Sequence, residues 1–336
     1  MINNRWEMGS SFHEYSDSQF AMQNHQSLLN EAELYLSGRY ALLDLVIYQH
    51  KHHGLLKLYI PSYYCHDITR LMSKIIEVEI YSCDPFTDVD LTLFPENSAV
   101  ILVEYFGNKA EVKVHKQNLL LILDKTHNPF SAYSYNFSID YTFGSLRKVL
   151  PLSDGGFLIP PVAISQLKPQ ENIKELKEAQ KAMQLKKSFL AGCDIDKSDF
   201  LNAYGRFEEF LNLNDDVLPI STKSQESVFS MDTAKLLVTK KNSLEYLNSY
   251  YQDNQKIKLF LNDCYFSFFI NPEKFVELKA ALIKAKVYPA ILWPAYNGDY
   301  NLIGGDILIS LHADFRYSLK DMKILTDILD GIFCDL

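Results

Sequence analysis

Two nearly continuous apolar runs constrain the fold of this chain more than any other feature. Residues 98–107 read SAVILVEYFG and residues 118–127 read NLLLILDKTH, and neither run alternates between apolar and polar positions. Strands that are apolar on both faces lie inside parallel sheets whose two faces are covered by helices. The runs therefore predict an α/β fold built around a mostly parallel sheet.

The rest of the chain extends this pattern. Further strands are expected at 56–62, 76–84, 134–145 and 155–161, and helices at 26–50 (with a break at 37–39) and 67–75. Beyond residue 161 the sequence predicts helices at 171–189, 197–211, 239–252 and 271–286, strands at 257–263 and 264–270, and a strand, turn and helix within 307–329. We expect an N-terminal segment (1–34), a large domain (35–235) and a small α+β domain (236–336).

Composition argues against several classes of function. The 336-residue chain has a net charge of −9 without basic clusters, which argues against nucleic acid as a partner. Its five cysteines form no CxxC pair, so neither a disulfide scaffold nor a metal site is expected. No secretion signal and no apolar run of membrane-spanning length is visible, so we expect a cytoplasmic protein without a membrane partner. A small molecule remains as the expected substrate.

Three features fall where strands end, and ligands of open α/β sheets bind beyond the carboxyl ends of the strands. The first is SGRYAL (37–42), a small-residue turn that opens a helix. Its first N–H groups suit a phosphate, and Gly38 lets the backbone approach closely. An ordinary helix N-cap is the alternative.

The second feature is Asp124, which ends the apolar run LLLILD, with His127 three residues further on. A buried carboxylate is costly unless it meets a cation or hydrogen-bond donors. One use for it is to keep a pyridinium nitrogen protonated, as cofactor enzymes require. An exposed strand end or a helix N-cap is the alternative for Asp124, and a single histidine is more often a packed or solvated one.

The third feature is Lys148, which lies in SLRKVLPLSDGG (145–156). The step from strand to turn fixes its backbone, and Gly155 and Gly156 let the next strand fold back beside it. Desolvation by Phe143, Leu146 and Leu150 would lower its pKa, so that its amine could form a Schiff base. A solvent-exposed surface lysine is the alternative.

Taken in order, these features resemble those of the fold-type I pyridoxal-phosphate enzymes, and most closely the DegT/DnrJ/EryC1 group of sugar aminotransferases. That group has a Ser-Gly-Thr-x-Ala-Leu turn, an Asp-x-x-Gln or Asp-x-x-His, and a lysine followed by an acidic residue and Gly-Gly. Further similar segments are YIPSYYC (59–65), KKNSLEYL (240–247) and LHADFRYSLKDM (311–322). The resemblance covers about residues 30–330.

This resemblance implies a large domain with a mixed, mostly parallel seven-stranded sheet and a small α+β C-terminal domain. It also implies pyridoxal 5'-phosphate as the cofactor, held covalently by Lys148, which would then shuttle a proton in the reaction. Asp124 would pair with the pyridine nitrogen, and His127 would lie near the hydroxyl of the cofactor ring.

The same resemblance implies how the phosphate is held. The main-chain N–H groups of Gly38 and Arg39 would bind it, although Arg39 replaces the usual threonine. Ser145 would add a hydroxyl, because Phe143 stands where the group usually has a serine.

Two more residues complete the predicted site. Tyr64 is a candidate to cover the cofactor ring, although Cys65 aligns with the stacking aromatic of the group. Arg316 lies in a strand-to-helix turn, where an arginine fork suits a substrate carboxylate. For Arg316, a surface salt bridge is the alternative.

The sequence thus predicts a homodimeric pyridoxal-phosphate aminotransferase. Its substrate would be a nucleotide-linked sugar or a related metabolite of polysaccharide or secondary metabolism. Two alternatives stay open: another pyridoxal-phosphate reaction, such as that of a lyase, dehydratase or racemase, and a non-catalytic protein that keeps the fold.

Overall fold

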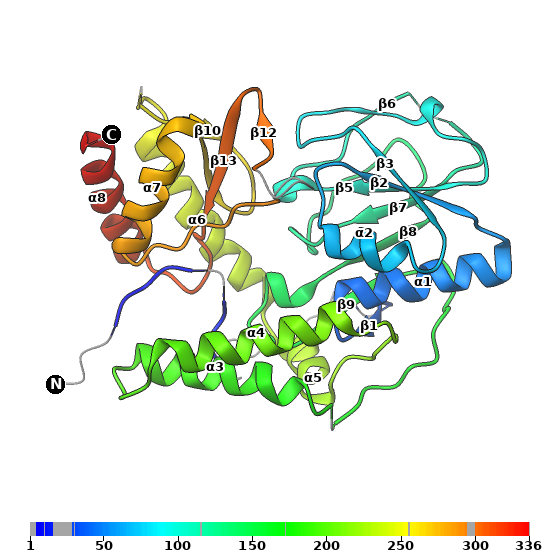
Figure 1. Cartoon of the computed structure of the whole chain (residues 1–336), viewed down its shortest axis with the longest axis horizontal. Helices are drawn as coiled ribbons and strands as arrows, with labels where there is room; N and C mark the ends of the chain where they lie inside the picture. Colours follow the sequence, from blue (N-terminus) through cyan, green and yellow to red (C-terminus); the bar gives the residue numbers. More distant parts are fainter. Residues whose placement is uncertain are drawn as a thin grey trace. The chain divides into compact units, whose positions relative to one another are not determined.

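The computed structural model describes residues 5–9, 11–15, 29, 31–114, 116–171, 173–254, 256–293 and 300–335. The chain divides into two compact units (Figure 1). One unit is Phe12–Met231, and the other combines Met1–Ser11 with Asp232–Leu336. The two ends of the sequence therefore belong to one unit, and the middle of the sequence forms the other.

Within the described residues, a seven-stranded sheet organises the Phe12–Met231 unit, in the order β1-β9-β8-β7-β5-β2-β3. The five strands from β8 to β3 in this order are parallel, whereas β9 runs antiparallel to both β8 and β1. The strands are β1 (Glu33–Tyr35), β2 (Lys57–Pro61), β3 (Glu77–Tyr81), β5 (Ala99–Val103), β7 (Leu120–Asp124), β8 (Tyr141–Gly144) and β9 (Gly156–Ile159). The predicted mixed, mostly parallel seven-stranded sheet is confirmed.

The two apolar runs occupy the middle of this sheet. Every residue of β5 is buried, and so are the last four residues of β7. Helix α1 (Gly38–His53) packs on β1, β8 and β9, and α2 (His66–Met72) packs on β3. The carboxyl ends of β5, β7 and β8 meet at one edge of the sheet, since these strands are parallel neighbours.

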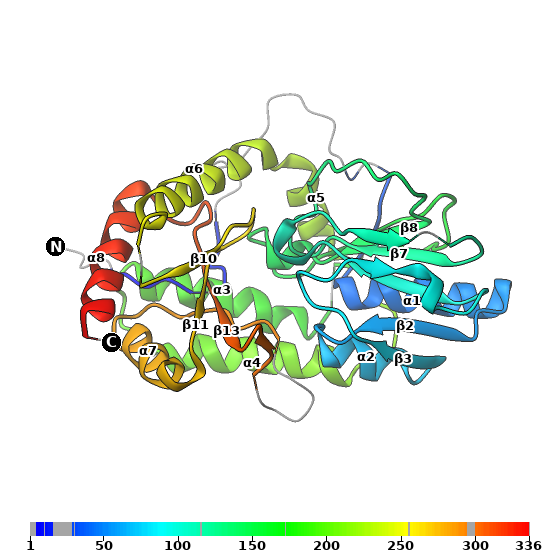
Figure 2. The same cartoon turned by 90° about the horizontal axis from the view of Figure 1, so that it is seen from above.

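Further elements of this unit follow or flank the sheet. Helices α3 (Leu176–Leu190) and α4 (Lys197–Leu213) lie side by side in both views (Figures 1 and 2) and pack against each other. Helix α5 (Thr222–Ser230) follows them, and β4 (Val89–Asp90) pairs with β6 (Val112–Val114). Three short 3-10 turns, η2 (Leu91–Leu93), η3 (Tyr105–Gly107) and η4 (Leu146–Lys148), connect the strands.

The helix predicted for residues 26–36 is wrong over its described part. Residues 33–35 instead form the edge strand β1, in which Glu33, Leu34 and Tyr35 pair with β9. Hydrogen bonding to an otherwise open sheet edge outweighs local helix propensity here. Residues 26–28 and 30 of that predicted helix lie outside the described residues. The strand expected at 134–145 is also shorter, because only residues 141–144 pair.

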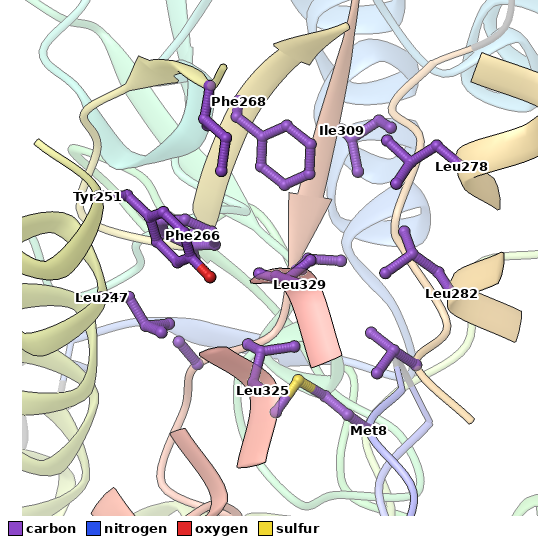
Figure 3. Close-up of a cluster of buried hydrophobic side chains, with 14 of the residues drawn as sticks. Met8, Leu247, Tyr251, Phe266, Phe268, Leu278, Leu282, Ile309, Leu325 and Leu329 are labelled. Atoms are coloured by element: carbon purple, nitrogen blue, oxygen red, sulfur yellow. The ribbon is translucent and has the colours of Figure 1, made fainter. Parts of the chain in front are cut away.

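The second unit contains an antiparallel sheet in the order β10-β11-β13-β12, again within the described residues. Its strands are β10 (Lys258–Phe260), β11 (Phe266–Ile270), β12 (Leu302–Ile303) and β13 (Asp306–Leu311), and its helices are α6 (Thr233–Tyr251), α7 (Pro272–Lys284) and α8 (Leu319–Asp335). Figure 3 shows apolar side chains of both strands and helices, including Phe266, Phe268, Leu278 and Leu325, meeting in one core. The predicted small α+β C-terminal domain is confirmed.

The N-terminal residues of the chain join this second core. Met8 is fully buried in it, its N–H donates to the carbonyl of Lys286 at 3.0 Å, and its carbonyl accepts from the N–H of Tyr288 at 2.8 Å. The indole of Trp6 donates to the carboxylate of Asp321 at 2.9 Å. Among the described residues, none of the helices combines the length and hydropathy needed to cross a membrane.

Candidate active site

The predicted phosphate turn, the lysine turn and the Gly-Gly pair are joined through the main chain of Gly155. Its N–H donates to the carbonyl of Leu36 at 2.8 Å. Its carbonyl accepts from the N–H groups of Leu146 and Arg147 at 3.0 and 3.3 Å. The turn η4, which carries Lys148, is therefore fastened to the residues that lead into α1.

Glycines make this arrangement possible, because three of them leave no room for a side chain. A Cβ on Gly156 would lie 2.1 Å from the carbonyl carbon of Ser37, and one on Gly38 would lie 2.8 Å from the carbonyl oxygen of Gly144. A Cβ on Gly144 would lie 2.7 Å from the ring of Phe157. Close approach of main chains accounts for these glycines.

Ser37 and the first turn of α1 form an anion cradle, by which we mean the Ser37 hydroxyl with the N–H groups of Gly38 and Arg39. Ser37 is the N-cap residue but makes no side-chain cap hydrogen bond. It is 2% exposed, and its hydroxyl oxygen has no hydrogen-bond partner among the described residues. The first N–H groups of a helix have no intrahelical acceptor. Groups of this kind can bind an anion such as a phosphate.

The side chain of Arg39 points toward α4 instead of toward solvent. Its Nη1 donates to the carbonyl of Leu211 at 2.8 Å and to Oδ1 of Asn212 at 2.6 Å. Its main-chain N–H stays in the first turn of α1, where it was predicted to contribute.

Asp124 ends β7 with its carboxylate almost wholly buried, at 4% exposure. The hydroxyl of Tyr64 donates to one of its oxygens, and the N–H of Thr126 donates to the other at 2.8 Å. Burial raises the pKa of Asp124, and these two donors partly oppose that rise. A carboxylate held in this way is not an exposed strand end, and it can accept a further hydrogen bond from a cationic N–H.

His127 is buried and accepts a hydrogen bond at Nδ1 from the N–H of Phe106, at 2.7 Å. The proton of the neutral ring must then be on Nε2. Phe106 has φ of 55°, in the left-handed region that bulky residues avoid. The turn after β5 is thus held in a strained conformation that fixes the tautomer of His127.

Ser145 links the lysine turn to the loop after Asp124. It is buried, and its N–H donates to the hydroxyl of Thr126 at 3.2 Å. Thr126 therefore contacts both Asp124 and Ser145, a role that nothing in its sequence position predicted.

Lys148 itself is exposed at the surface of this unit. Its pKa is lowered to about 8, first by the positive charge of Arg147 and then by desolvation of the amine among surrounding protein atoms. Arg39 lowers the pKa further, whereas Glu208 and Cys65 raise it.

The lowered pKa agrees with the sequence analysis, but its main cause differs. Phe143, Leu146 and Leu150 were expected to desolvate the amine, and they are instead buried in the interior at 2% exposure or less. A neighbouring arginine, rather than an apolar wall, contributes most.

Tyr64 and Cys65 were the two candidates to cover the cofactor ring. Tyr64 is 1% exposed and directs its hydroxyl to Asp124. Cys65 is partly buried and precedes α2.

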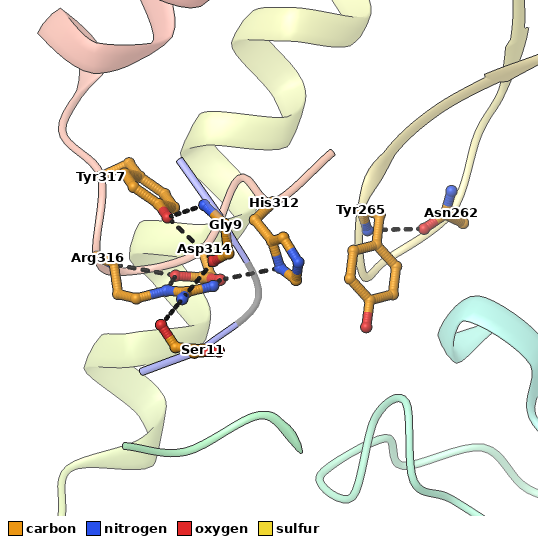
Figure 4. Close-up of polar contacts among 8 residues, drawn as sticks. All are labelled: Gly9, Ser11, Asn262, Tyr265, His312, Asp314, Arg316 and Tyr317. Atoms are coloured by element: carbon orange, nitrogen blue, oxygen red, sulfur yellow. Dashed lines mark hydrogen bonds and ion pairs between the residues drawn. The ribbon is translucent and has the colours of Figure 1, made fainter. Parts of the chain in front are cut away.

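Arg316 lies in the other unit, between β13 and α8, and its side chain is 2% exposed. Its Nε and Nη2 donate to the two oxygens of Asp314 at 2.8 and 2.6 Å, and Nη1 donates to the carbonyls of Gly9 and Ser11 at 2.6 and 3.1 Å (Figure 4). The role of Arg316 toward a substrate carboxylate stays a prediction.

The acidic residue of the lysine motif turns out to anchor a helix. Asp154 is fully buried and accepts hydrogen bonds from the N–H and hydroxyl of Ser221, at 2.7 and 2.8 Å, and from the hydroxyl of Ser224. Ser221 is the N-cap of α5, so Asp154 joins the lysine loop to that helix.

Comparison with known proteins supplies structural neighbours only. No protein-family model matches this sequence, and no curated protein matches it. The fold is similar to Spr1654 from Streptococcus pneumoniae, described as a sugar aminotransferase, with a TM-score of 0.64, 11% identity and 98% of each chain covered.

Two further solved structures share the fold. PseC of Helicobacter pylori, an aminotransferase involved in the biosynthesis of pseudoaminic acid, has a TM-score of 0.63 and 15% identity, with 98% of this chain and 100% of PseC covered. DesI, solved in the presence of its TDP-sugar product, has a TM-score of 0.55 and 14% identity, with 94% and 87% covered. The chain therefore has the fold of sugar aminotransferases, which is fold type I of the pyridoxal-phosphate enzymes.

Proposed function

We propose that this protein is a pyridoxal-phosphate-dependent aminotransferase that acts on a nucleotide-linked sugar. The observation that carries the proposal is the connection of the segments that carry Lys148, Asp124 and the anion cradle through a few hydrogen bonds. Gly155 joins the cradle to the lysine turn, and Thr126 joins that turn to the loop of Asp124.

The residues present fit the cofactor. The buried hydroxyl of Ser37, without a partner among the described residues, and the first N–H groups of α1 suit a phosphate. The buried carboxylate of Asp124 suits a protonated ring nitrogen, and His127 would lie beside the ring hydroxyl. Ser145 and Tyr64 are proposed to complete the set, as hydroxyl donor and ring neighbour.

When bound, the cofactor supplies an electron sink that makes a proton on the amino-bearing carbon of the substrate acidic. Lys148 would bind the cofactor through its amine and, once released from it, carry that proton as a general acid and base. A lysine with a pKa of about 8 is suited to both tasks, because a useful fraction of its amine is neutral near physiological pH. Asp124 would keep the ring nitrogen charged.

The substrate class follows from the neighbours with this fold. Spr1654 is described as a sugar aminotransferase, and PseC as an aminotransferase involved in the biosynthesis of pseudoaminic acid, while DesI was solved in the presence of its TDP-sugar product. Arg316 is proposed as a substrate ligand, which requires an incoming carboxylate to replace Asp314 or the carbonyls of Gly9 and Ser11 on its guanidinium. We further propose a cytoplasmic homodimer, in line with the prevalence of two-fold symmetric dimers.

The test is covalent labelling of the purified protein. After incubation with pyridoxal phosphate, the protein should absorb visible light, and borohydride should fix the label on Lys148. Lys148→Ala should abolish the label, and the exposed Lys181→Ala should keep it. Label on other lysines only, or none at all, would contradict the site.

The reaction is tested separately with amino donors. We expect a donor to convert the bound cofactor stoichiometrically to its amine form, and a keto-sugar nucleotide to restore the original spectrum. Loss of ammonia or carbon dioxide from the donor, without this return, would indicate a different reaction of the same cofactor.

A further inference from the structure

We propose that helix α4 governs the reactivity of Lys148 through Arg147 and Glu208, which act as positioning residues. The part that a reactive Lys148 would play in catalysis rests on the proposed function. The influence of Arg147 and Glu208 on the protonation of its amine does not. Neither Arg147 nor Glu208 is among the predicted site residues, and they lie 61 residues apart in the sequence.

The contact between Arg147 and Glu208 is bidentate. Nη1 and Nη2 of Arg147 donate to the two carboxylate oxygens of Glu208 at 2.6 and 3.1 Å. The guanidinium also lies over the ring of Phe207, 5.9 Å from its centroid. The side chain of Arg147 is only 11% exposed, so this fork is held in one place, on the residue that precedes Lys148 in η4.

The same face of α4 holds a second arginine. Leu211 and Asn212, about one helical turn beyond Glu208, bind the guanidinium of Arg39. Both arginines that lower the pKa of Lys148 are therefore hydrogen-bonded to residues of α4.

The ionisable groups near the lysine turn carry more positive than negative charge. Arg39, Arg147 and Lys148 bring three basic groups, whereas Glu208 brings one carboxylate, in a chain whose net charge is −9. Cys65 is a further ionisable group that acts on Lys148. The Nε of Arg147 is buried without a hydrogen-bond partner among the described residues, so its charge is only partly compensated.

Glu208 stays ionised throughout the neutral range. Burial raises its pKa, but Arg147 and Lys148 outweigh burial and lower the pKa to about 2. Its charge therefore does not change while Lys148 titrates, and α4 supplies a constant field. Arg147 favours the neutral amine, and Glu208 limits how far that effect goes.

The experiment measures the titration of Lys148 directly in protein free of cofactor. Each protein is treated with limiting acetic anhydride across a pH series, and acetylation of the Lys148 peptide is quantified by mass spectrometry. The variants are Glu208→Gln, Arg147→Met and Arg147→Lys, and the matched control is Glu209→Gln, the exposed next residue of α4.

In the native protein we expect half-maximal labelling near pH 8. Arg147→Met should move this midpoint up by roughly one pH unit, and Glu208→Gln should move it down by a similar amount. Arg147→Lys keeps the charge and should stay near the native value, as should Glu209→Gln. A merely structural role of the Arg147–Glu208 pair would move the melting temperature without these opposite shifts.

Unchanged midpoints in both Arg147→Met and Glu208→Gln, or shifts of the same sign, would overturn the proposal. If Arg147→Met does not fold, the difference between Glu208→Gln and Glu209→Gln decides. If the labelling midpoints shift as expected but borohydride fixes no label on Lys148, the proposed function is contradicted and the role of α4 still holds.

Discussion

Asp124 and Ser37 carry buried polar groups that the protein itself satisfies to different degrees. Asp124 has two donors, from Tyr64 and Thr126, whereas the hydroxyl of Ser37 has no partner among the described residues. A buried hydroxyl without a partner costs stability, about 1–3 kcal/mol by mutational comparison. Such a cost is expected where a ligand later supplies the missing contact.

The first prediction at this scale concerns Asp124→Asn. The amide keeps the size of the side chain but removes the charge that would pair with the ring nitrogen, so affinity for pyridoxal phosphate should fall by about tenfold or more. Spectroscopic titration of the cofactor measures this. Asp88→Asn, at an exposed position, should bind as the native protein does, and equal losses in both variants would contradict the role of Asp124.

Single residues differ in how far the sequence could predict them. Gly38, Asp124 and Lys148 stand next to strand ends or turns, so local pattern indicated them. Glu208 and Ser221 reach the same region from distant helices, and no periodicity in the chain predicts such a pairing. The left-handed φ of Phe106 was equally hidden, because only the tertiary contact with His127 requires it.

At the scale of elements, close contacts between main chains fix the site. Strand β9 begins at Gly156, directly against Ser37 before α1, and Tyr35 of β1 pairs with Gly156. The start of α1, the start of β9 and the turn η4 therefore behave as one block. Movement of one of them must disturb the hydrogen bonds of the others.

Two substitutions of glycine by alanine, one at this block and one in α4 as a control, test the close approach. Gly156→Ala places a Cβ 2.1 Å from the main chain of Ser37, so we expect it to destabilise the protein by about 3 kcal/mol or more. Gly205 lies inside α4, where an added Cβ would meet open space, so Gly205→Ala should instead stabilise by about 0.5–1 kcal/mol. Urea unfolding followed by circular dichroism measures both, and similar values for the two variants would contradict the close approach.

Elements with strong apolar character were predictable, whereas β1 and α5 were not. The central strands β5 and β7 appear where their apolar runs stand in the sequence. β1 was predicted as helix, and α5 was not predicted, because a neighbour decides each of them: β9 provides the pairing for β1, and Asp154 binds Ser221 and Ser224 at the start of α5.

At the scale of the whole molecule, the chain closes one unit with both of its ends. Residues 5–9 pair with residues near 287 and pack into the core of α6, α7 and α8. The guanidinium of Arg316 ties Gly9 and Ser11 to this unit while it pairs with Asp314. The N-terminal segment is thus part of the fold of the second unit.

The stability of the protein at low pH tests the ion pair between Arg316 and Asp314. Burial opposes ionisation of Asp314, but Arg316 and His312 outweigh it and hold the pKa of Asp314 well below its ordinary value of 3.8. A carboxyl whose pKa is lower in the folded state stabilises the fold above its unfolded pKa, and this stabilisation is lost as the pH falls below about 4. We expect Asp314→Asn to be less stable at pH 7 by about 3 kcal/mol, since it leaves Arg316 buried without its ion pair.

Tryptophan fluorescence during urea unfolding reads out this effect, because both tryptophans, Trp6 and Trp293, belong to this unit. The native protein should lose stability between about pH 5 and pH 3 more steeply than Asp314→Asn does. The exposed Asp253→Asn should follow the native curve. Parallel pH profiles for native protein and Asp314→Asn would show that the pair does not stabilise this unit.

The similarity of fold at the whole-chain scale coexists with very little shared sequence. Identity is 11% to Spr1654 and 15% to PseC, while nearly all of this chain superposes on both. The sequence motifs nevertheless predicted the fold, because glycines at main-chain contacts and a carboxylate at a strand end are required by geometry. The exposed surfaces of helices do not require particular residue types in this way, so their sequences do not reveal the shared fold.

The close main-chain contact of Gly155 and Gly156 with the residues around Ser37 also affects how this protein can be redesigned. The contacts at this junction are made by peptide backbone, which exchanging side chains cannot reshape. Libraries aimed at the surroundings of Lys148 are better placed in α4, where side chains make the contacts. Positions 38, 144 and 156 are best left untouched, since each tolerates only the smallest residue.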